Sequence, residues 1–162
     1  MSKNGDHTTR AKQILAHIQY VTLATVTENG EPWNSPVART LDAEFNVYWI
    51  SDKESQHSRN VRNNGNAFIV VYDSTVTKSE NKAGVYLQAQ ARELEDSEEI
   101  QTARELIQGP DSKSTEVFSG DGVRRIYQAR PQQVWMNSVI MKDGKFVKDI
   151  RVELSLGELR AG

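Results

Sequence analysis

The chain has 162 residues, no cysteine, and 20 basic against 22 acidic side chains, so its formal net charge is −2. This length indicates one domain, and the balanced charge gives no reason to expect nucleic acid or an anionic membrane as a partner. The absence of cysteine excludes disulfides, thiolate metal sites and a cysteine nucleophile, and with a polar N-terminus that lacks an apolar leader it favours a cytoplasmic protein.

The first third of the chain predicts one helix followed by three strands. Residues 1–7 are polar and are expected to be disordered, after which Thr8 or Thr9 can cap a helix with apolar residues on one face. Three segments rich in β-branched and aromatic residues come next, separated by short polar turns, and they form an antiparallel meander. These segments cover residues 20–27, 32–40 and 45–51.

The middle of the chain predicts a second helix and two more strands. A polar segment without β-branched residues favours a short helix over residues 55–63, with Ser55 as its N-cap and Gly65 just beyond its end. A nearly all-apolar strand over 67–72 and an alternating strand over 84–94 follow, separated by a polar loop.

The last third predicts a third helix and a final group of strands. A helix is expected to begin at Asp96 and to run to about residue 108. Its first residues are acidic, and negative charge is favourable at the positive N-terminal end of a helix. Residues 123–129 are expected to form a helical turn before Pro131. Strands are expected over residues 133–137, 139–142 and 146–153, with a tail over 154–162.

These elements predict a mainly β protein with flanking helices. Hairpins join the early strands, so we expect six antiparallel strands that close into a barrel rather than a doubly wound sheet. A single domain is expected over residues 8–153, between the two tails. Because hydrophobic residues make up only 37% of the chain, we expect a second copy to cover its exposed aromatic strands in a homodimer.

The common catalytic motifs are absent from the sequence. His7, His17 and His57 lie far apart without metal-binding spacing, and no GxSxG nucleophile elbow occurs. The glycine patterns of Rossmann and P-loop nucleotide sites are also missing.

The segment over residues 47–64 carries the candidate site. An aromatic strand leads into a polar turn and then a helix whose first residues include Ser55 and His57, with arginines nearby. Free amides at a helix N-terminus beside cations attract a phosphate, and the strand offers a flat wall to an aromatic ring system. The same pattern is also typical of a solvated helix capped by Ser55 on a plain barrel.

An ordered set of segments, rather than one strong motif, suggests a family resemblance over about residues 12–137. These segments are 20–32, 35–40, 47–51, the Ser55-x-His57-x-x-Asn60 helix, 63–71, 85–94 and Pro131-Gln-Gln-Val-Trp135. In this order they resemble the pyridoxamine 5′-phosphate oxidase-like family of FMN-binding split barrels.

The resemblance implies an antiparallel, Greek-key split barrel that binds FMN at a dimer joint, and it assigns roles by position. One strand would run beside the flavin with the backbone groups of Ser35, Pro36, Val37, Ala38, Arg39 and Thr40. The end of the next strand would contact the ring and the ribityl chain through Ile50 and Ser51, and the helix start would bind the phosphate through Ser55, Gln56 and His57. Trp135 and Asn137 would reach in from the second subunit.

Two features depart from the family pattern. Where the family often has Arg-Lys or x-Lys, this chain has Gln56-His57, which supplies less positive charge for a phosphate. Cations at Arg39, Lys53, Arg59 or Arg62 are candidates to compensate. The chain also lacks the C-terminal Arg-x-His-x-Arg segment of true pyridoxamine phosphate oxidases, so that reaction is not expected.

The expected function is that of an FMN-dependent oxidoreductase which passes hydride between a nicotinamide or small-molecule donor and an acceptor. A flavin performs this chemistry itself, in agreement with the lack of a catalytic triad. A non-catalytic flavin-binding or stress-associated protein stays open as an alternative. So does a barrel that binds deazaflavin F420 or haem, with His57 as the expected haem ligand.

Overall fold

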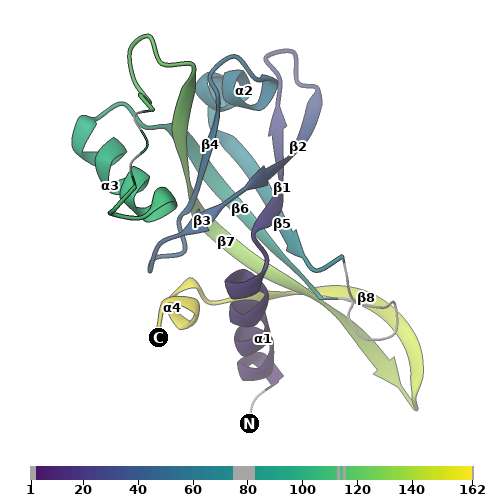
Figure 1. The fold of residues 1–162 in the computed structure, drawn as a ribbon. Coiled ribbons are helices and arrows are strands. Elements are labelled where there is room, and N and C mark those ends of the chain that lie inside the picture. The colour runs from purple at the N-terminus through teal and green to yellow at the C-terminus, as the bar shows by residue number, and fades with distance from the viewer. Residues whose placement is uncertain (1–2, 75–82, 113, 115, 162) are drawn as a thin grey trace.

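The computed structural model describes residues 3–74, 83–112, 114 and 116–161. Eight strands form one antiparallel sheet with the order β2-β1-β5-β6-β7-β4-β3, and β8 pairs with β7 (Figure 1). The strands are β1 (Tyr20–Val26), β2 (Pro32–Ala38), β3 (Thr40–Leu41), β4 (Val47–Asp52), β5 (Asn66–Tyr72), β6 (Gly84–Glu93), β7 (Arg124–Lys142) and β8 (Lys145–Leu154). The helices are α1 (Lys3–His17), α2 (Gln56–Asn64), α3 (Ser97–Gln108) and α4 (Leu156–Arg160).

The sheet curls into a split barrel rather than a closed one. Its two outermost strands, β2 and β3, are consecutive in the chain and are separated only by Arg39. Among the described residues no ladder joins β2 to β4, so a gap between these strands remains in the barrel wall. The mainly β, split-barrel fold is thus confirmed. The expected closure of six strands is corrected to an open sheet of eight.

Alternation along the strands builds the core. In β1 the residues Val21, Leu23 and Thr25 are buried while their neighbours are partly or fully exposed, as expected for a strand with one face on a core. On the buried face of two neighbouring strands, the ring of Trp49 on β4 stacks on that of its register partner Tyr127 on β7 at 5.4 Å between centroids. Buried side chains therefore fill the interior of the barrel, which leaves its outer surface and its two ends for a ligand.

The helices cover different parts of the barrel. Figure 1 shows α2 and α1 at opposite ends of the sheet, with α4 beside α1. Helix α3 packs on the outer side of β4 and β7, where a second apolar cluster includes Leu94, Ala103, Phe118 and Ile126. One end of the barrel is therefore covered by α2, and the other end is covered by α1 and α4.

The structure corrects the predicted helical turn at residues 123–129. These residues enter β7, a single 19-residue strand that also contains the separately predicted strands 133–137 and 139–142. Residues 127–129 pair with β4 on one side and β6 on the other. Pro131 is accommodated because the register shifts between Gln88 and Ala89, and such irregularities tolerate a residue without an N–H.

The chain ends also differ from the prediction. Helix α1 begins at Lys3, inside the segment expected to be disordered, and α4 forms within the expected tail, with Leu159 2% exposed. Residues 75–82, most of the expected polar loop, lie outside the described residues. That residues 8–153 form a single domain stays a prediction.

Candidate functional site

Helix α2 begins with backbone amides that no side chain caps. Ser55 has extended N-cap angles, but its hydroxyl forms no capping bond and instead donates to the Ser58 hydroxyl at 2.8 Å. The helix ends at Gly65, whose φ of 68° is left-handed, as expected from the sequence. The first N–H groups of α2 are therefore available to an acceptor from outside the helix.

Three serine hydroxyls surround the His57 imidazole. Nδ1 lies 3.2 Å from the Ser35 hydroxyl of β2, and Nε2 lies 2.8 Å from Ser51 of β4 and 3.1 Å from Ser55. The imidazole thus bridges the gap between β2 and β4. Burial lowers the pKa of His57 below its usual value, so the ring is neutral at pH 7.

Most of the candidate cations are engaged elsewhere. Arg39 donates to carbonyl oxygens at the C-terminal end of α1, at the opposite end of the barrel from α2. Arg59 bonds to the turn that precedes α2, and Arg62 pairs with Glu93 at 3.0 Å. The Lys53 ammonium has no ion-pair or hydrogen-bond partner within the described part of the chain, so it is the cation free to approach an anion at α2.

Gln56 is held along its own helix. Its amide nitrogen donates to the Asn60 side chain at 2.8 Å, and its carbonyl oxygen accepts from Arg59 at 3.1 Å. Asn60 is buried and donates to the Thr25 hydroxyl at 2.9 Å, which ties α2 to β1. The Gln56 side chain is therefore engaged within α2, and it is Asn60 that ties the helix to the barrel.

The remaining candidates on β2 and β4 point in opposite directions. Val37 is buried, whereas Pro36 and Ala38 are exposed on the outer side. Ile50 packs against the cluster under α3, opposite to Ser51, as alternation requires. Thr40 pairs with Tyr48 where β3 meets β4.

Trp135 and Asn137 lie apart from α2. Trp135 stacks on Phe68 of β5 at 6.3 Å, and Asn137 accepts from the backbone of Gly84. On the same face the Arg151 guanidinium lies 4.2 Å from the centroid of the Tyr86 ring. The structure brings Ser35, Ser51, Ser55 and His57 together. Within one chain, Trp135 and Asn137 lie away from this cluster. That the pair comes from a second subunit stays a prediction.

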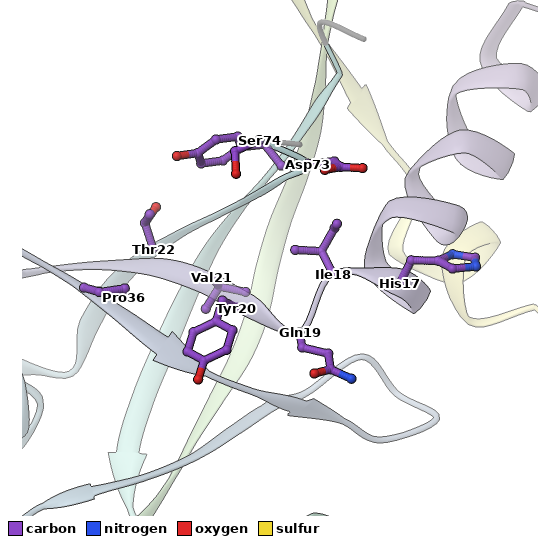
Figure 2. A pocket seen from close by; sticks show the side chains of 10 residues that line it. His17, Ile18, Gln19, Tyr20, Val21, Thr22, Pro36, Asp73 and Ser74 are labelled. Atoms are coloured by element: carbon purple, nitrogen blue, oxygen red, sulfur yellow. The ribbon is translucent and has the colours of Figure 1, made fainter. Parts of the chain in front are cut away.

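A shallow hollow of about 400 Å³ adjoins the outer side of β1 and β2. Figure 2 shows Tyr20 and Pro36 on one side and Ile18, at the end of α1, on another. Tyr20 and Tyr72 line it and are 64% and 50% exposed. These two tyrosines were not predicted as site residues from the sequence, although each stands at a strand end on the polar side of the alternation.

Comparison with known families identifies the fold. The profile described as pyridoxamine 5′-phosphate oxidase matches residues 8–138, most of the chain. The chain belongs to the pyridoxamine 5′-phosphate oxidase-like family. No curated protein sequence matches it significantly.

Several solved structures share this family's fold. A haem-binding protein from Mycobacterium smegmatis is 20% identical with a TM-score of 0.67, over 96% of this chain and 60% of its own length. A protein related to general stress protein 26 from Clostridium acetobutylicum is 12% identical, with a TM-score of 0.63 over 95% and 97%. The haem storage protein HutZ from Vibrio cholerae is 16% identical, with a TM-score of 0.58 over 78% and 91%. At these identities the likeness concerns the fold.

Neither a membrane span nor a metal cluster is found in the described part of the chain. None of its helices is both long and apolar enough to cross a bilayer. No three side chains of the metal-binding kinds come together there.

Proposed function

We propose that this chain is an FMN-binding oxidoreductase that holds the cofactor phosphate at the start of α2. The observation that carries the proposal is the joint presence of uncapped α2 amides and the hydroxyls of Ser35, Ser51 and Ser55 around one imidazole. Amides and hydroxyls that converge at a helix N-terminus form the donor set that a phosphate requires. Lys53 would add a charge.

The free edge of β2 suits the flavin ring. β2 pairs with β1 along one edge only, so alternate backbone groups on its other edge are left for a ligand. Pro36, on the exposed side of β2, lines the hollow that also contains Tyr20. A planar ring laid along β2 would meet backbone donors and acceptors at one side and apolar surface at the other.

A second copy would complete the site. Members of the family are typically dimeric. The outer face of β5, β6 and β7 carries Phe68, Tyr86 and Trp135, an aromatic surface of the kind enriched at interfaces. If this face packs against the β2 side of a second copy, Trp135 and Asn137 enter the partner's flavin site, as the family resemblance implies.

When bound, FMN supplies the redox chemistry, accepting and returning hydride equivalents. The protein's own residues bind and orient it: the α2 amides, the serine hydroxyls and Lys53 hold the phosphate. A neutral His57 can take up a proton when the phosphate arrives. Binding would then raise the pKa of His57, so FMN affinity should increase as the pH falls from 8 toward 6.5.

The test is titration of the purified protein with FMN, followed by the visible spectrum during anaerobic NADPH or NADH addition. We expect saturable binding and bleaching of the flavin band. Lys53→Gln should weaken FMN binding about tenfold, or about 1.4 kcal/mol, whereas Lys148→Gln on the exposed part of β8 should leave it unchanged. Tight FMN that no donor bleaches would leave a flavin-binding protein without the oxidoreductase activity.

Haem is the second candidate ligand, because two structures of similar fold are a haem-binding and a haem storage protein. In this chain both His57 nitrogens lie within hydrogen-bond distance of hydroxyls, so iron ligation through Nε2 would have to displace Ser51 and Ser55, and ligation through Nδ1 would have to displace Ser35. Addition of hemin distinguishes the two ligands. A Soret band that His57→Ala abolishes would favour haem over FMN.

A further inference from the structure

A second hollow lies at the α1 end of the barrel, opposite α2. It has a volume of about 680 Å³, within the range of small-molecule sites. Residues of α1, β3, the turn after β3 and α4 line it: Lys12, Leu15, Ala16, Ile18, Gln19, Arg39, Thr40, Leu41, Ala43, Phe45, Leu159 and Arg160.

The walls of this α1–α4 hollow are largely apolar. Leu15 and Leu159 are 1% and 2% exposed, and Ile18, Leu41 and Phe45 pack against the main core while remaining partly open. Phe45 has a φ of 61°, a left-handed angle that costs a non-glycine residue energy. The backbone therefore holds an aromatic ring at the hollow in a conformation that the residue does not favour by itself.

All charged residues that line the hollow are cations. Lys12 donates to the carbonyl oxygen of Ala161, and Arg160 lies 3.2 Å from the carboxylate of Glu44, which is outside the lining. Arg39, like Lys12, has no carboxylate partner among the described residues. It differs from Lys12 in that one of its nitrogen atoms is buried without a hydrogen-bond partner.

Arg39 donates to the carbonyl oxygens of Leu15 and Ile18 through one terminal nitrogen, and its Nε is buried without a partner. No carboxylate of the described residues pairs with it. Burial lowers the pKa of Arg39 because desolvation disfavours the charged form. Arg39 is half-buried and has no counter-ion among the described residues, so an incoming anion would gain a preformed, charge-assisted partner.

We propose that the α1–α4 hollow binds an amphipathic monocarboxylate, such as a medium-chain fatty acid. Its carboxylate pairs with Arg39, and its hydrocarbon chain lies against Leu41, Phe45 and Leu159. This site is distinct from the α2 site, so occupancy by such an anion does not depend on FMN binding.

Isothermal titration calorimetry with decanoate and 1-decanol, which share a ten-carbon chain, tests the charge requirement. We expect decanoate to bind at least tenfold more tightly than decanol. Arg39→Met, which keeps the aliphatic stem, should remove this preference, and Arg124→Met on β7 should keep it. Equal affinities for the two ligands, or no decanoate binding to the wild type, would overturn the proposal.

A second variant keeps the test valid if Arg39→Met fails to fold. Ala43 is exposed at the hollow, so Ala43→Trp can fill it without disturbing the core. We expect this variant to lose decanoate binding at least tenfold while its circular dichroism and FMN affinity stay unchanged. Undiminished decanoate binding to Ala43→Trp would place the ligand elsewhere and refute the assignment.

Discussion

Replacement of Gly65 by alanine should destabilise the protein far more than a glycine replacement in an open turn. Gly65 joins α2 to β5 with a φ of 68°, and its carbonyl accepts from the Ala91 amide at 2.7 Å. A Cβ at this position would lie 2.6 Å from the Ala91 carbonyl oxygen and 2.2 Å from the Gln90 side-chain nitrogen. The glutamine can rotate away, but the backbone of β6 cannot.

Gly30→Ala is the matched control. Gly30 has a φ of 84° and nothing within 4 Å of a new Cβ, so the control measures the backbone angle alone, about 1–2 kcal/mol. For Gly65→Ala the clash adds to this angle cost, and we expect about 3 kcal/mol or more in all.

Urea unfolding followed by circular dichroism gives both free energies of unfolding. A loss of about 3 kcal/mol corresponds to a fall in Tm of about 6–12 °C for a chain of this size. Gly65→Ala should also weaken FMN binding, because the α2 amides move with the helix. Equal destabilisation by the two variants would show that β6 does not confine Gly65 and would refute this account of how α2 is positioned.

Two further predictions concern His57 and α4. The pKa of His57 is lower in the folded protein than in the unfolded chain, so the unfolded chain binds more protons near pH 6. The stability that the neutral ring contributes is therefore complete above about pH 6.5 and is lost as the pH falls. His57→Asn should therefore flatten the decline of the ligand-free urea midpoint between pH 7 and 5, and an unchanged slope would contradict the assigned burial. Leu159→Ala should lower the free energy of unfolding, measured in urea, by about 2–3 kcal/mol. Leu106→Ala, at a site 39% exposed, should lower it by less than about 1 kcal/mol. Similar values for the two variants would mean that α4 does not pack on the core.

Local signals made much of the fold predictable. Alternation in residues 20–27 anticipated the two faces of β1, and Ser55 and Gly65 marked α2 to within one residue. The strand at residues 124–129 could not be recognised, because its buried run fits a helix equally well and Pro131 suggested a break. Its pairing with both β4 and β6 depends on contacts far away in the sequence.

The site was predictable in part for the same reason. Ser55 and His57 are neighbours in one turn, so the sequence placed them together. That Ser35 and Ser51 meet the same imidazole depends on the gap between β2 and β4. Arg39 was one candidate to balance the phosphate. However, its side chain lies at the other end of the barrel, because the chain turns from β2 into β3 beside α1.

The central claim, that α2 holds a flavin phosphate, is tested most directly by comparing FMN with riboflavin in one fluorescence-quenching titration. Riboflavin has the same ring and ribityl chain but no phosphate. With about two charge-assisted bonds from helix amides at about 1.5 kcal/mol each, FMN should bind roughly 100-fold more tightly. Equal affinity for the two flavins would contradict the claim, since the start of α2 would then make no contact that depends on the phosphate.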